Sequence, residues 1–159
     1  MSHTRGSGAY ITAFRVGAPQ NLALRFQEHE MTYELNQKQF ESVMALPDVK
    51  RFEHFISRIV DWEEVWSLKS PSGWATVHSK QRLCIPFWSH PKYAQAFANG
   101  EWLGYVAEKI ELDDFLEKWL PGINKDNNFV AVFPNLDMQG IVAETSRVLA
   151  AINEELEKY

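Results

Sequence analysis

The chain carries one cysteine, Cys84, and the nearest histidines, His78 and His90, are the candidate bases for it. A thiolate nucleophile needs a base within hydrogen-bond reach and surroundings that lower the pKa of the thiol. Such a pair would support a small cysteine-dependent hydrolase or transferase. Cys84, however, lies between Leu83 and Ile85 in an apolar stretch, where a free cysteine packs as a small core residue. We therefore predict a buried and inert thiol.

The other polar residues give no spacing that is typical of a metal or acid-base site. The five histidines form no i, i+4 pair and no H-x-H motif, and a single cysteine excludes a multi-cysteine zinc site. Asp113, Asp114 and Glu117 fit the first turn and solvated face of a helix. Walker A, G-x-S-x-G and H-E-x-x-H motifs do not occur. We predict no catalytic residue, no metal and no cofactor.

The six tryptophans are the main peculiarity of the composition. A buried indole needs a partner for its N–H, so tryptophans often lie at the rim of a core or at a binding surface. We predict a recognition surface at Trp74, Trp88, His90 and Trp102. Trp88 is expected to cover the junction between a strand and the next helix, with one edge open to a partner. The alternative is a small-ligand pocket floored by Trp74, Trp88 and Trp102.

Hydrophobic periodicity predicts the helices that position these residues. The predicted segments are 36–46, 48–60, 91–98, 111–120 and 147–159. Asp48, Ser89, and Thr145 or Ser146 are the expected N-caps, and Pro121 with Gly122 is expected to end the fourth helix. In the second helix the charged residues should occupy the solvated side. These are Lys50, Arg51, Glu53 and Arg58.

Alternating and β-branched residues predict strands at 64–69, 74–78, 82–87, 102–110 and 128–134. The turn-rich residues 70–73 should join the first two strands as a hairpin, and the strand at 82–87 should end before Trp88. We predict an α+β domain with one mixed sheet of about five strands. Its first three strands form a meander, and four to five helices pack on the sheet.

Length and charge restrict the class of protein. With 159 residues and a formal charge of −5, the chain fits one soluble domain without an electrostatic reason to bind nucleic acid. No apolar run is long enough to span a bilayer, and the N-terminus lacks a continuous signal-peptide core. We therefore predict a cytoplasmic protein without nucleic-acid or membrane partners, and a homodimer remains compatible with this composition.

The first thirty residues differ from the rest because Gly, Ser and Pro interrupt a weak periodicity. We predict that Met31 is the natural start. Residues 1–30 are then a poorly ordered or non-native N-terminal extension, and residues 31–159 form a single globular domain. The alternative is that residues 9–16, "AYITAFRV", add a strand.

Four segments, "EVWSLKSPSGWATV", "IPFWSHPKYAQAFANGEW", "IELDDFLEKWLPGI" and "NFVAVFPN", occur in this order. Together they resemble the bacterial domain-of-unknown-function family number 2750, over about residues 31–159. The arrangement is also distantly similar to the N-terminal domains of SseB-type secretion-associated proteins. The resemblance implies a compact bacterial cytoplasmic domain and carries over no catalytic residue.

These observations favour a non-enzymatic protein-interaction or small regulatory module whose partner is another protein. Two alternatives stay open. One is the hydrolase or transferase that uses Cys84 with His78 or His90, and the other is the ligand-binding domain with a tryptophan-lined pocket.

Overall fold

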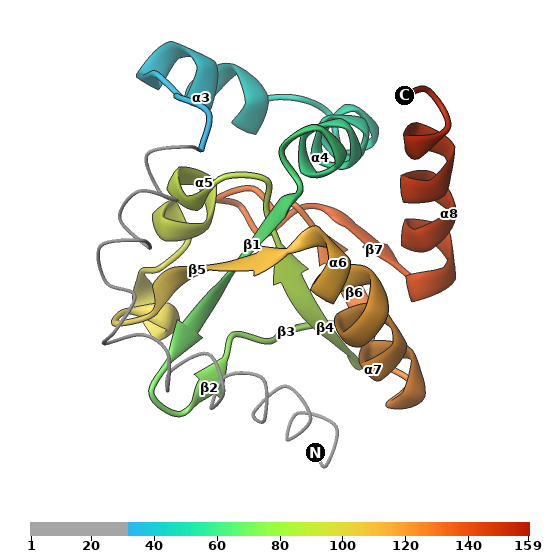
Figure 1. Cartoon of the computed structure of the whole chain (residues 1–159). Helices are drawn as coiled ribbons and strands as arrows, with labels where there is room; N and C mark the ends of the chain where they lie inside the picture. Colours follow the sequence, from blue (N-terminus) through green and yellow to red (C-terminus); the bar gives the residue numbers. More distant parts are fainter. Residues whose placement is uncertain (1–31) are drawn as a thin grey trace, which may run out of the picture.

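The computed structural model describes residues 32–159, so the predictions for residues 1–30 and for Met31 lie outside the described residues. In the described part, strands form the centre and helices lie around them, which confirms the α+β class (Figure 1). The helices are α3 (Gln37–Met44), α4 (Asp48–Trp62), α5 (Pro91–Ala96), α6 (Leu112–Asp114), α7 (Leu120–Lys125) and α8 (Thr145–Leu156). The strands are β1 (Glu64–Ser70), β2 (Gly73–Trp74), β3 (Val77–Ser79), β4 (Arg82–Phe87), β5 (Val106–Glu111), β6 (Phe129–Val132) and β7 (Ile141–Ala143).

The strands form two sheets, so the prediction of one five-stranded sheet with an N-terminal meander is wrong. One sheet has the order β2-β1-β5, and the other has the order β3-β4-β6-β7, in which β4 and β6 run parallel. The predicted hairpin between β1 and β2 is confirmed. The predicted strand at 74–78 divides at residues 75–76, where the chain leaves the first sheet and enters the second.

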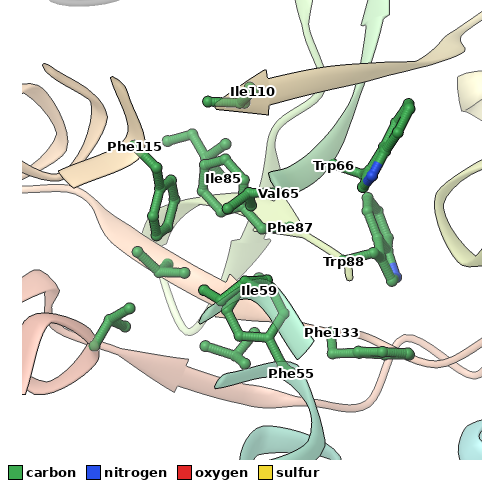
Figure 2. Packing of buried hydrophobic residues seen from close by; sticks show 14 of the residues in the cluster. Phe55, Ile59, Val65, Trp66, Ile85, Phe87, Trp88, Ile110, Phe115 and Phe133 are labelled. Atoms are coloured by element: carbon green, nitrogen blue, oxygen red, sulfur yellow. The ribbon is translucent and has the colours of Figure 1, made fainter. Parts of the chain in front are cut away.

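The two sheets meet at one bridge between Trp66 and Trp88. The N–H of each residue donates to the carbonyl of the other, over 2.8 and 2.7 Å, and Ser67 Oγ donates to the carbonyl of Pro86 over 2.7 Å. Extended backbone therefore persists to Trp88, one residue beyond the strand end that the sequence predicted. Figure 2 shows both indoles on the same side of this junction.

The opposite side of the junction holds the centre of the apolar core. Phe87 and Phe115 meet edge to face with their ring centroids 4.9 Å apart, and Phe55 and Ile59 of α4 close the cluster from below (Figure 2). These four side chains have no exposed surface. Burying each one stabilises the fold by about 1.5–3 kcal/mol relative to leaving it in water. The core thus holds α4 against both sheets.

Two helix ends differ from their predictions. His90, rather than Ser89, is the N-cap of α5, because its Nδ1 accepts a hydrogen bond from the N–H of Lys92 over 3.0 Å. The helix predicted to end at Pro121 continues to Lys125. It widens into a π-helical segment over Phe115–Trp119, which ends two positions before the proline. This widening accommodates a residue that has no N–H for the helical ladder.

Helices α4 and α8 also begin one residue away from the expected caps. The N-cap of α4 is Pro47, with Asp48 as the first helical residue, and the N-cap of α8 is Glu144, with Thr145 following it. Neither cap residue makes a side-chain cap hydrogen bond. Asp48 still favours the helix from the first turn, where a carboxylate complements the helix dipole.

Candidate functional site

Cys84 does not form a nucleophilic pair with His78. The thiol has no exposed surface, its Sγ lies 3.7 Å from the carbonyl oxygen of Arg82, and burial raises its pKa. Across the β3–β4 ladder Cys84 stands opposite Val77. His78 is the next residue of β3, so its side chain projects from the other face of the sheet, where it is exposed. Both features oppose a reactive thiolate at this position.

Both ring nitrogens of His90 are engaged in hydrogen bonds, so His90 does not pair with Cys84 either. Its Nδ1 accepts from the N–H of Lys92, and its Nε2 lies 2.8 Å from the carbonyl oxygen of Tyr33. A carbonyl only accepts, so Nε2 carries the proton and Nδ1 has the lone pair. This neutral tautomer joins the start of α5 to the segment before α3. A ring nitrogen with free base function is therefore not available to Cys84.

The four residues of the predicted recognition surface divide into two groups. Trp88 and His90 are buried, and the Trp88 Nε1–H donates to the carbonyl of Pro134 over 3.0 Å. The expectation that one edge of Trp88 is open to a partner is therefore wrong. Trp74 and Trp102 are half-buried, and their use in recognition stays a prediction.

The tryptophans also pack in separate clusters. Trp88 and Trp102 both contact Phe97, with ring centroids 5.2 and 5.1 Å apart. Trp74 instead meets Trp119 edge to face at 4.7 Å. The described ring contacts thus do not bring Trp74, Trp88 and Trp102 around one pocket floor.

Trp88 supports the β6–β7 loop (residues 133–140), which was not among the predicted sites. Leu136 and Met138 are 53% and 51% exposed in this loop. The backbone that carries them is tied internally, because Asn135 Oδ1 accepts from the N–H groups of Asp137 and Gln139 over 2.9 and 3.0 Å. The N–H of Asn135 also donates to the carbonyl of Gln139 over 2.8 Å. The result is a compact loop with an apolar tip.

Arg51 of α4 fixes this loop from behind. Its side chain is almost completely buried. Nε donates to the carbonyl of Phe133 over 3.0 Å, and the guanidinium also donates to the carbonyls of Leu46 and Gln139 and to Asp48 Oδ1. The prediction that Arg51 lies on the solvated side of the helix is wrong. Four acceptors around one guanidinium hold both ends of the β6–β7 loop to the start of α4.

The end of the loop approaches β6 closely. A Cβ at Gly140 would lie 2.9 Å from the carbonyl oxygen of Val132 and 3.0 Å from Cα of Pro134. Only glycine fits at this distance without a shift of the backbone. The chain also turns at Phe133 with a left-handed φ of 49°, which is uncommon for a bulky residue. The close approach at Gly140 and the left-handed φ of Phe133 thus restrain the β6–β7 loop in addition to the hydrogen bonds of Arg51 and Trp88.

The sequence contained part of the signal for this loop. Pro134, Asn135 and Gly140 are turn-forming residues, and they lie between two β-rich segments. The burial of Arg51 had no local signal, because its most distant acceptor is 88 positions away in the chain.

Within residues 32–159, no helix combines the length and apolar character needed to cross a membrane. No group of three or more His, Cys, Asp or Glu side chains in this range is arranged to hold a metal ion. The search of curated proteins produced no match.

The family model described as "Protein of unknown function (DUF2750)" matches residues 52–152, which is more than half of the chain. The matched region extends from the second turn of α4 into α8 and includes Trp88 and the whole β6–β7 loop. The chain belongs to the DUF2750 family of proteins of unknown function.

Proposed function

We propose that the domain is a non-enzymatic module that binds another protein through the β6–β7 loop. One observation carries the proposal. Two large apolar side chains, Leu136 and Met138, are half exposed on a loop that Arg51 and Trp88 hold in place.

The free energy of binding favours such a loop for two reasons. Removing apolar surface from water contributes about 25 cal/mol per Å², and a loop that is already ordered loses little conformational freedom on binding. Met138 adds adaptability, because its unbranched side chain fits partner surfaces of different shape. The tip is therefore suited to a partner that offers an apolar groove.

We call the exposed side chains of Leu136 and Met138 the loop surface. The hydrogen bonds from Arg51 to the carbonyls of Phe133 and Gln139 hold the loop that carries them against α4.

Leu103 provides a contrast within the same molecule. It is 79% exposed, more than either residue of the loop tip. It lies between Gly100 and Gly104, which both have positive φ. Single exposed apolar residues of this kind are ordinary on protein surfaces. Leu103 is therefore a suitable control position.

The state of the predicted catalytic groups also supports a binding role. Cys84 is buried with a raised pKa, and both ring nitrogens of His90 are engaged. The hydrolase or transferase alternative would need these groups to separate from their present partners. We retain the expectation of a bacterial cytoplasmic protein, with a homodimer as the alternative assembly.

The test compares three immobilised proteins in a lysate of the organism that encodes the chain. They are the wild type, the double variant Leu136→Ser with Met138→Ser, and the control Leu103→Ser. We expect a protein that the wild type and the control capture and that the double variant loses. The stability of both variants should stay within about 0.5 kcal/mol of the wild type, since the substitutions are on the surface. Equal capture by all three proteins, or no capture at all, would refute the proposal.

A further inference from the structure

Helix α3 is attached to the domain less firmly than its neighbours α4 and α5. None of its residues is fully buried, and Phe40, Val43 and Met44 reach the core only with half-buried side chains. Helix α5, by contrast, buries Tyr93 and Ala94 completely. Among the described helices and strands, none has its backbone close to α3 over more than a short stretch. Burial of apolar surface therefore stabilises the docked position of α3 only weakly.

Both ends of α3 are nevertheless fixed. Before the helix, Lys92 Nζ donates to the carbonyl of Leu35 over 2.7 Å, and the side chain of Leu35 is buried. After the helix, the Arg51 guanidinium donates to the carbonyl of Leu46. The first turn between these two points is closed by a reciprocal capping box within the helix itself. α3 is thus a short, self-contained helix suspended between two anchored segments.

The ring of Tyr93 lies beneath α3. Phe40 stacks on this ring, with centroids 5.4 Å apart and planes inclined by 18°. The side chain of Tyr93 has no exposed surface, and its hydroxyl has no hydrogen-bond partner among residues 32–159. A buried hydroxyl without a partner destabilises the closed state, whereas water satisfies the same hydroxyl once the ring is uncovered. The orphan hydroxyl and the weak docking of α3 therefore both lower the free energy of opening.

We propose that α3 is a lid that opens separately from the rest of the domain and uncovers Tyr93 to water. The hydrogen bonds of Lys92 and Arg51 persist in the open state, so the lid closes again on the same ring. Tyr93 also contacts Phe133, the first residue of the β6–β7 loop, at 4.7 Å between centroids. Opening therefore exposes an aromatic surface behind that loop. The lid does not depend on the binding role proposed for the loop surface.

Hydrogen exchange of the native full chain, followed amide by amide with NMR, tests the lid. We expect the hydrogen-bonded amides of α3 to be protected at least about a hundredfold less than the most protected amides of α4, because α3 opens without global unfolding. Low concentrations of denaturant should accelerate exchange in α3, since opening exposes surface, but less steeply than global unfolding does. Equal protection of α3 and α4 would overturn the proposal.

Two variants and one matched control distinguish an opening lid from a frayed helix. Tyr93→Phe removes the orphan hydroxyl and should slow exchange in α3 about tenfold, which corresponds to about 1.4 kcal/mol. Phe40→Ala removes the stacked ring and should accelerate exchange in α3 at least about tenfold. Tyr105→Phe removes a hydroxyl from the half-buried residue before β5, and exchange in α3 should not change.

The outcomes that contradict the lid are specific. If α3 exchanges fast but at the same rate in Tyr93→Phe or in Phe40→Ala as in the wild type, the helix frays without uncovering the ring. If Tyr105→Phe slows exchange in α3 as much as Tyr93→Phe does, the effect does not come from the ring beneath the helix. Either result would refute the proposal.

Discussion

The two ends of strand β4 contrast in what their buried residues contact. At the first end, Cys84 has apolar neighbours and one long contact with a carbonyl in its own strand. Beyond the second end, Trp88 bonds to the β6–β7 loop and to β1, and His90 bonds to the segment before α3. The side chains of Cys84 and Trp88 both have no exposed surface. Burial alone therefore does not distinguish a packed residue from one that holds distant segments together.

The contrast shows where the polar groups of the chain are used. Polar side chains in the interior are stable there only when their hydrogen-bonding groups are paired. At the second end this pairing is long-range, since Trp88 and its acceptor are 46 positions apart. Trp88 and His90, which suggested a recognition site, thus position the β6–β7 loop and α5.

The largest expected effect comes from removing the indole at the second end. Trp88→Ala should reduce the free energy of unfolding by about 3–5 kcal/mol, because it empties a large buried site. Trp88→Phe should recover most of the packing but leave the carbonyl of Pro134 without its donor, at about 1–2 kcal/mol. Chemical denaturation measures both. An unchanged stability of Trp88→Ala would contradict the contrast between the two ends.

A substitution of Arg51 tests the second set of hydrogen bonds that hold the β6–β7 loop. Arg51→Met should destabilise the protein by about 3 kcal/mol, because three carbonyl oxygens, those of Leu46, Phe133 and Gln139, lose a charged donor. The exposed neighbour provides the control, and Lys50→Met should change stability by less than about 0.5 kcal/mol. If both variants unfold at the same denaturant concentration, Arg51 does not hold the loop.

Much of the fold could be predicted from the sequence. Helices α4 and α8 and most of the strands follow from periodic apolar residues, which is local information. Strand β7 was not predicted, and β5 begins at Val106 rather than at residue 102. The division into two sheets could not be predicted in this way. β1 pairs with β5 and β4 pairs with β6, and no local pattern states which distant strand provides the partner.

The candidate site was less predictable for the same physical reason. Charged residues flank Arg51 in the sequence, as they flank many solvated residues. Its burial depends instead on a hydrogen bond to the carbonyl of Phe133, which lies 82 positions later in the chain. Trp88 was identified as important, but its role as a hydrogen-bond donor to Pro134 requires the fold. The sequence gives the charge of a side chain directly, whereas its hydrogen-bond partners follow only from the fold.

At the first end of β4 a smaller effect is expected. Cys84→Ser should destabilise the protein by about 1–3 kcal/mol, since it places a hydroxyl in an apolar site, and Cys84→Ala should cost less. In the wild type, a thiol reagent should label Cys84 only as fast as the protein opens. Fast labelling under native conditions would reverse the contrast and support the hydrolase or transferase alternative.

The smallest effect concerns pH and His54, which contacts the loop through Phe133. The folded state holds the pKa of His54 at about 4, below its ordinary value of 6.5, so the unfolded chain takes up the proton first as pH falls. The contribution of His54 to stability is thus present above about pH 6.5 and is lost towards pH 4. Relative to His54→Leu, the wild type should lose about 1 kcal/mol over this range, a value reduced for partial exposure. A pH-independent difference between the two proteins would show that His54 is not held neutral.

The central claim is that the loop surface, and not the Cys84 end of β4, contacts a partner. The most direct measurement places a photo-crosslinking amino acid at position 136, and in a second protein at position 103, in the organism that encodes the chain. We expect position 136 to crosslink to one protein partner and position 103 not to do so. The Arg51→Met substitution should weaken the crosslink from position 136, because the loop is then no longer held. Crosslinking of the same partner from position 103 alone, or equal crosslinking from both positions, would contradict the claim.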